Sequence, residues 1–297
     1  MPGGIDFTHA WTFQIKCMMA NQYARLVQAL HVESADDVIA VCLRLGWNDA
    51  FKHVSENVPD ADMLSECDKN GWLDMFAGRK KKVTPGMSGF KIIDTEKDEL
   101  AYRICKTLVE DFKKYAVLTN AANRAAYIHT CVEKSDFKDK FTPYKKISSS
   151  KHPLCFGHVQ KMFNMAMKLL LCLIMSREHA VSCGLTVKLG SIGKDDVYLA
   201  SGALSIENYT HEGKTFAFDS ADCPIDSIIL KAIDKKTSKK SSDIKKSIEH
   251  GNFEGIVWSK LGYTETEGNY EKAQKEIEEI QSGTGKSKLC FDFENWN

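Results

Sequence analysis

Residues 151–175 read KHPLCFGHVQKMFNMAMKLLLCLIM, and this stretch decides the fold of the chain. The stretch predicts a helix with apolar side chains around almost its whole circumference, and such a helix belongs in the middle of a domain. We expect the core of the protein to include four of its side chains, namely Met162, Phe163, Leu169 and Leu170.

A thin polar stripe on the same helix consists of Gln160, Lys161, Asn164 and Lys168. Spacings of three and four residues place Lys161, Asn164 and Lys168 on one face. A buried amide or ammonium group is costly unless it finds a partner. The stripe must therefore meet a polar network, a cleft or another chain.

Two carboxylates further along the chain, Asp222 and Asp226, flank a predicted helix start at Cys223-Pro224. The positive end of a helix dipole favours negative charge, so capping is one explanation of both aspartates. Pairing with Lys161 or Lys168 is the other explanation, and it would complete the polar network of the central helix.

The composition is that of a globular protein, with 297 residues and 43% hydrophobic residues. Forty basic residues balance forty acidic ones, and only six of the basic residues are Arg. A protein that coats DNA or RNA carries a strongly positive surface, usually rich in arginine. The sequence therefore does not favour nucleic acid as a direct ligand.

Ten cysteines occur without any C-x-x-C pair, and most lie inside apolar helical patterns, so we expect small buried side chains. The N-terminal residues MPGGIDFTHAW lack the pattern of a secretory signal, which predicts a cytoplasmic location. The apolar run 165–175 contains Lys168 and is far shorter than the roughly 20 residues that span a bilayer. We therefore expect no membrane insertion.

Apolar spacing predicts four helices before the central one, at 7–30, 34 to about 54, 95–115 and 121–131. Ser34 and Asp37 have the spacing of a capping box. Glycines, prolines and a basic run between residues 57 and 89 predict an irregular arm. We therefore place a helical N-terminal lobe with this arm at 1–90 and a larger helical C-terminal domain at 91–297.

Alternating apolar residues separated by glycines predict a small antiparallel β-sheet inserted near 185–218. A Lys- and Ser-rich loop is expected at 234–246, followed by a charged final helix with an ion pair between Glu271 and Lys275. The predicted fold class is α+β, predominantly α-helical.

Clusters of possible metal ligands include the set His152, Cys155 and His158 and the set Cys172, His179 and Cys183. Their spacings do not match a zinc finger or a zinc ribbon, so we interpret them as packing residues and predict no metal and no cofactor. Residues Gly283 to Ser287 resemble the end of a Walker motif. They follow a charged helix rather than a strand, which favours a turn.

Arg124 and His129 have the R-x4-H spacing of the ribonuclease motif in HEPN-type helical domains, which this segment resembles. In that family the pair acts on a phosphodiester, but the residue after Arg124 is Ala rather than the usual polar residue. The alternative is a solvent-facing Arg124 beside a histidine at the edge of the core. Apart from this pair, the sequence predicts no catalytic residues.

Three blocks in the C-terminal half carry a further resemblance. They read Phe156-Gly157-x-x-Gln160-Lys161-x-x-Asn164-x-x-x-Lys168, Cys223-Pro224-Ile225-Asp226-x-Ile228-Ile229-Leu230 and Trp258-Ser259-Lys260. In this order they resemble a family of mostly uncharacterised bacterial and prophage proteins. The predicted order of lobe, arm and larger lobe is also similar to that of phage inhibitors of the Gabija defence system. Those inhibitors form oligomeric shells around a host nuclease complex.

These resemblances lead to one main hypothesis about function. According to it, the chain is a non-enzymatic phage or mobile-element protein that associates with itself and inhibits a host anti-phage defence complex by binding it in the cytoplasm. One alternative is a HEPN-like ribonuclease that uses Arg124 and His129. The other is a structural interaction protein.

Overall fold

A computed structural model of the chain describes residues 34–51, 99–133, 156–182, 188–192, 195–198, 204–236, 261 and 269–295. These residues are 79% helical and contain seven α-helices and short antiparallel strands. The predicted class, α+β and predominantly α-helical, is thereby confirmed.

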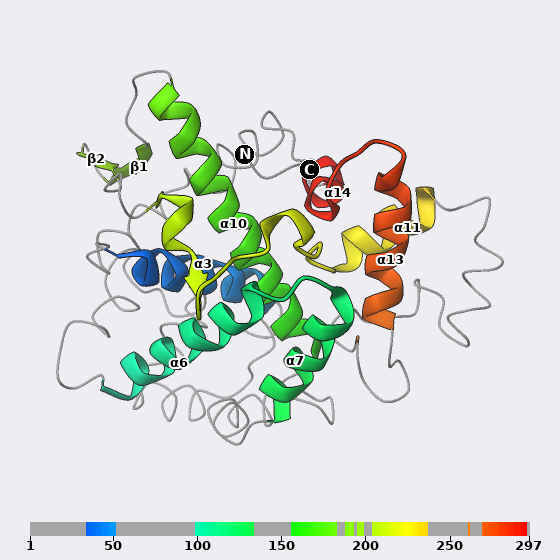
Figure 1. The fold of residues 1–297 in the computed structure, drawn as a ribbon, viewed down its shortest axis with the longest axis horizontal. Coiled ribbons are helices and arrows are strands. Elements are labelled where there is room, and N and C mark those ends of the chain that lie inside the picture. Colours follow the sequence, from blue (N-terminus) through cyan, green and yellow to red (C-terminus); the bar gives the residue numbers. More distant parts are fainter. Residues whose placement is uncertain are drawn as a thin grey trace.

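Helix α10 (Phe156–Ser182) runs through the middle of the described part of the molecule (Figure 1). Packed against it are α3 (Ala35–Phe51), α6 (Glu99–Ala116) and α7 (Ala121–Glu133). Three further helices contact one another beside this group. They are α11 (Ser227–Lys236), α13 (Asn269–Ser282) and α14 (Lys288–Asn295).

Burial along α10 matches the nearly all-round apolar pattern of its sequence. Every residue from Phe156 to Ser176 is buried except Met165, and the four predicted core side chains are among them. The helix is longer than its most apolar run, so Phe156–Glu178 has the length and composition of a membrane span. Its apolar window is buried inside the protein, as in the core helix of a folded domain.

Helix α3 begins with the predicted capping box. The backbone N–H of Ser34 donates to Asp37 Oδ2 at 2.8 Å, and the backbone N–H of Asp37 donates to Ser34 Oγ at 3.3 Å. Further along, Gly46 lies so near α10 that an added Cβ would sit 2.5 Å from the carbonyl oxygen of Met162. The absence of a side chain at Gly46 allows the two helices to approach.

The predicted antiparallel strands lie in the expected region and form two separate hairpins. Strand β1 (Lys188–Ile192) pairs with β2 (Asp195–Tyr198), and β3 (Thr210–His211) pairs with β4 (Lys214–Thr215). The β3–β4 turn contains Glu212 and Gly213 at φ 49° and 75°. Positive φ at both central positions is the requirement of a tight type I′ hairpin turn.

The helix after these hairpins starts later than the sequence pattern predicts. Helix α11 begins at Ser227 rather than at Cys223-Pro224, because Asp226 is its cap. Asp226 Oδ1 accepts the backbone N–H groups of Ile228 and Ile229 at 2.8 and 3.0 Å. On α13, Lys275 lies 3.9 Å from Glu279 instead of pairing with Glu271.

Several predicted segments lie outside the described residues. These are the helix at 7–30, the arm at 57–89, residues 237–246 of the Lys- and Ser-rich loop, and Trp258-Ser259-Lys260. The predicted boundary near residue 90 also falls outside them. Within the described part, the buried side chains of α3 belong to the same apolar core as those of α10.

Candidate functional site

The segment 221–226 is neither helix nor strand, and two glutamine side chains hold it. Gln160 of α10 donates to the Ile225 carbonyl at 2.7 Å and accepts the Ile225 N–H at 3.2 Å. Gln274 of α13 makes the same pair of bonds with Cys223, at 2.7 and 3.0 Å. Pro224 lies between them and has no N–H to satisfy. The two amides thus bind alternate residues, as neighbouring strands would.

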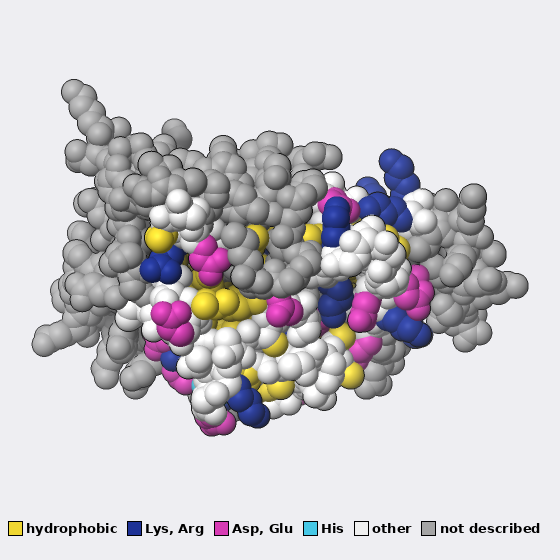
Figure 2. Space-filling view, turned by 45° about the horizontal axis from the view of Figure 1, so that its top comes forward, with side chains coloured by type: hydrophobic (Ala, Val, Ile, Leu, Met, Phe, Trp, Pro, Cys, Tyr) yellow, Lys and Arg dark blue, Asp and Glu magenta, His cyan; other side chains and the backbone are white. Residues whose placement is uncertain are grey.

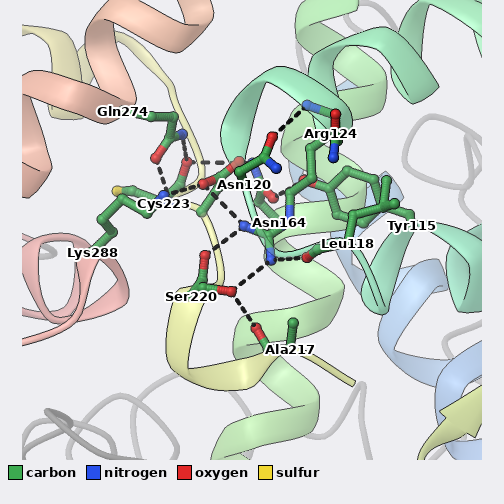
Figure 3. Close-up of polar contacts among 12 residues, drawn as sticks. Tyr115, Leu118, Asn120, Arg124, Asn164, Ala217, Ser220, Cys223, Gln274 and Lys288 are labelled. Atoms are coloured by element: carbon green, nitrogen blue, oxygen red, sulfur yellow. Dashed lines mark hydrogen bonds and ion pairs between the residues drawn. The ribbon is translucent and has the colours of Figure 1, made fainter. Parts of the chain in front are cut away.

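Asn164 joins this segment to two buried tyrosines (Figure 3). Its Oδ1 accepts the Tyr115 hydroxyl at 2.5 Å, and its Nδ2 donates to Tyr270 Oη at 2.9 Å. The same Nδ2 lies 3.3 Å from the Cys223 carbonyl. Burial, assisted by the charge of Asp222, raises the pKa of both tyrosines. They therefore act as neutral hydrogen-bonding groups.

Asp222 is the point where the network meets two cations. Its carboxylate accepts the Tyr270 hydroxyl at 2.8 Å, lies 3.1 Å from Arg124 Nη1 and binds Lys288 Nζ. Its side chain is fully buried. Asp222 therefore does not cap a helix, contrary to the capping explanation, and its partners are not the lysines of the central stripe.

The two stripe lysines bind different carboxylates. Lys161 Nζ lies 3.2 Å from Asp226 Oδ2, and Lys168 binds Asp292 in the C-terminal helix α14. Burial raises the pKa of Asp292, and the Lys168 ammonium opposes that rise. The first two blocks of the resemblance thus contact each other through the Gln160–Ile225, Lys161–Asp226 and Asn164–Cys223 contacts.

Arg124 is not solvent-facing, because it is only 1% exposed. Its guanidinium donates to the carbonyl oxygens of Leu118 and Ser220 in addition to its ion pair with Asp222. Burial lowers its pKa and Asp222 raises it, with a net rise. The ring of His129 instead packs on Phe156, with centroids 4.7 Å apart. The two residues of the R-x4-H motif thus contact different groups.

Some of the remaining candidate metal ligands and nucleophiles lie within the described residues. His158 is buried, and burial together with Lys161 lowers its pKa to about 3. The thiols of Cys42, Cys131, Cys172, Cys223 and Cys290 are buried. Within the described ranges, no group of three or more His, Cys, Asp or Glu side chains could hold a metal ion. His152, Cys155 and Cys183 lie outside those ranges.

Seven side chains of the network were not among the sequence-based candidates for it, namely Tyr115, Arg124, Ser220, Tyr270, Gln274, Lys288 and Asp292. The sequence does contain a signal that Asp292 is a buried carboxylate, because it stands between the apolar residues Phe291 and Phe293. An isolated carboxylate in one apolar run is a natural partner for an isolated lysine in another. The tyrosines carried no such signal, since their spacing is that of ordinary core residues.

A cavity of about 310 Å³ lies beside the network. Its walls come from the turn between α6 and α7, from the 3-10 helix η6 (Phe218–Ser220), from one face of α13 and from the start of α14. Ser220, Gln274 and Lys288 belong both to the network and to the cavity wall. The cavity is thus the place where a solute could come near the buried charges.

Comparisons of the chain with protein-family models, with curated proteins and with solved structures found no match. The geometry of the site therefore carries the functional argument. In that geometry the charged and amide side chains bind one another and the backbone of segment 221–226. This arrangement fixes helices relative to one another, and it does not display a reactive pair at a surface.

Proposed function

We propose that this protein acts by binding another protein rather than by turning over a substrate. The supporting observation is that the charged side chains of the described core are already engaged. Arg124, Lys168 and Asp222 are each at most 1% exposed, and each has an oppositely charged partner in contact. Their geometry suits a rigid helical scaffold, whose binding surfaces lie elsewhere.

The charge distribution also supports a protein partner. On the face drawn in Figure 2, Lys and Arg side chains are interspersed with Asp and Glu side chains over the described residues. Nucleic acid is bound mainly through a continuous basic surface. A mixed surface is more typical of proteins that recognise other proteins.

The specific form that we propose is a phage or mobile-element protein that associates with itself and inhibits a host defence complex in the cytoplasm. This form rests on the two resemblances described above. We assign the partner contacts to the predicted arm at 57–89 and to residues 237–246 of the predicted loop, because residues 234–236 belong to helix α11. Segments that are polar and longer than ordinary connections often carry function.

Light scattering of the purified protein and a pull-down from host lysate test this proposal. We expect a homo-oligomer and a retained host complex. Replacing residues 57–89 with a short Gly/Ser linker should remove the host complex, while Lys231→Gln on the exposed face of α11 serves as the control. A monomer that retains no partner would contradict the proposal.

One pair of variants distinguishes the ribonuclease alternative from the binding proposal. Arg124→Ala removes the partner of a buried carboxylate and should lower stability whatever the function is. His129→Ala removes only a half-buried ring contact. An RNA-cleaving activity that His129→Ala abolishes without a change in stability would replace the binding proposal with the nuclease.

A further inference from the structure

Beside the cavity, the buried group around Asp222 has more positive than negative charge. Two cations, Arg124 and Lys288, contact the single carboxylate of Asp222. Among the described residues, no other carboxylate pairs with either cation. Lys288 lines the cavity with 11% of its side chain exposed, whereas Arg124 is 1% exposed and is not among the lining residues; both are labelled in Figure 3. A buried excess charge is costly, so an anion entering here would be stabilised.

The Lys288 ammonium also has hydrogen-bonding capacity left. An ammonium group has three N–H donors, and in the described structure Asp222 is the one partner of Lys288. The hydroxyls of Ser287 and Thr119 line the same cavity and can donate as well. Oxyanions such as phosphate are bound in proteins by this combination of one ammonium and several neutral donors.

The cavity lining also contains carboxylates, Asp219 from η6 and Glu271 and Glu278 from α13. Glu271, Gln274, Lys275 and Glu278 line the cavity together, because spacings of three and four residues place them on one face of α13. In the described part of the chain, Glu271 and Glu278 have no ion-pair partner. They are available to accept hydrogen bonds from an ammonium group of a ligand whose anionic end lies at Lys288.

We propose that this cavity binds a small molecule that carries both a phosphate and a primary amine. The phosphate lies against Lys288 and Ser287, and the amine lies against Glu271 and Glu278. The volume of about 310 Å³ is at the lower end of the range of small-molecule sites. The inference is independent of the proposed protein partner, since it is argued from Lys288, Glu271 and Glu278, and the partner contacts are assigned to other residues.

Calorimetric titration of the full chain with O-phosphoethanolamine, inorganic phosphate and ethanolamine tests the proposal. We expect O-phosphoethanolamine to bind more tightly than either fragment. Lys288→Gln should weaken the binding of O-phosphoethanolamine and of phosphate by about tenfold or more, the effect of one lost charge-assisted hydrogen bond. Glu278→Gln should weaken O-phosphoethanolamine binding severalfold and leave phosphate binding unweakened.

The test does not depend on Lys288→Gln alone. If that variant does not fold, Glu278→Gln carries the test, because Glu278 lines the cavity and its side chain is exposed. Lys231→Gln is the matched control, since Lys231 is exposed on α11 and outside the cavity wall. Absence of saturable binding, or equal weakening by Lys231→Gln, overturns the proposal.

A ligand with a phosphate and a primary amine can be a soluble metabolite or a lipid headgroup. Vesicles that contain phosphatidylethanolamine distinguish the two. Binding of soluble O-phosphoethanolamine without retention on vesicles assigns the site to a soluble metabolite. Retention on vesicles that Lys288→Gln or Glu278→Gln abolishes assigns it to a lipid headgroup.

Discussion

Leu170 lies on the most deeply buried part of α10, and its side chain is 0% exposed. Leu170→Ala should lower the free energy of unfolding by about 2–5 kcal/mol, because it removes packed methyl groups and leaves a cavity. Urea unfolding measures this change. Val181 on the same helix is 56% exposed, so Val181→Ala should change stability by less than about 0.5 kcal/mol. Equal effects of the two substitutions would contradict the packing of α10.

Gly46 should tolerate no side chain, although alanine is the better helix former. Gly46→Ala gains about 1 kcal/mol of helix propensity. The new Cβ, however, would lie 2.5 Å from a backbone oxygen of α10, and such overpacking costs about 1–3 kcal/mol or more. We expect a net loss in thermal unfolding. Gly283→Ala, where nothing lies within 4 Å of the added Cβ, is the control, and a stabilised Gly46→Ala protein would show that α3 lies farther from α10.

At the scale of single residues, the sequence allowed a prediction of what is buried more readily than of what it contacts. Apolar density along one helix identified the core side chains and the polar stripe. The partners Asp292 and Tyr115 are 124 and 49 residues away from the stripe residues they bind. A solvent-facing Arg124 was one of two interpretations of the sequence, which shows only its local spacing to His129. Its burial depends on Ser220 and Asp222 from a distant segment.

Helix α14 is joined to α10 by the buried pair of Lys168 and Asp292. Lys168→Met should destabilise the protein by about 3–5 kcal/mol, since it leaves a buried carboxylate without its cation. Lys161→Met should cost less, because Asp226 keeps its capping bonds to α11 and is 22% exposed. Chemical denaturation of both variants gives the comparison.

The double variant Lys168→Met/Asp292→Leu provides the control for this prediction. Replacing both partners of a buried pair by apolar groups is often neutral, so most of the lost stability should return. If the double variant is as unstable as Lys168→Met, the loss comes from packing rather than from the unpaired carboxylate.

At the scale of elements, long periodic segments were the predictable ones. Helix α3 begins at its capping box, and α6, α7 and α10 lie where apolar spacing placed them. Helix α14 has only eight residues, about two turns, and so offers too little sequence for a period to be recognised. Helices of that length are stable only through tertiary packing. The start of α11 was misplaced because Asp222 and Asp226 both have the chemistry of a cap, and only one of them caps.

The stability of the whole protein should fall in mild acid because of His158. Its pKa is lowered to about 3 in the folded protein, while an unfolded histidine titrates near 6.5. Below about pH 6.5 His158 is protonated in the unfolded chain but remains neutral in the folded protein. The free energy of unfolding therefore falls by about 1.4 kcal/mol for each pH unit of acidification. The contribution is present above that pH and is lost progressively toward pH 3.

Urea unfolding of the native protein and of His158→Leu between pH 7 and pH 5 checks this prediction. The free energy of unfolding of His158→Leu should depend less steeply on pH, because the variant has no imidazole at this position to protonate in the unfolded chain. Parallel slopes for the two proteins would show that His158 is accessible to protons in the folded state.

For the molecule as a whole, the class of the fold followed from the sequence and the arrangement of its parts did not. Helical periodicity and glycine-separated strands were enough to predict a mainly helical α+β protein. That β1–β2 and β3–β4 form separate hairpins depends on pairing across segments, which alternation along one strand cannot specify. The cavity likewise arises from four separate segments that meet only in space.

The amide bonds between the two glutamines and segment 221–226 have a consequence for hydrogen exchange. Backbone N–H groups are usually protected by other backbone groups, in helices or sheets. The N–H groups of Cys223 and Ile225 are bonded instead to side chains carried by two different helices. Exchange at Cys223 requires its bond to Gln274 of α13 to open, and exchange at Ile225 requires its bond to Gln160 of α10 to open. Two amides in one short segment thus report separately on the contacts of that segment with two helices.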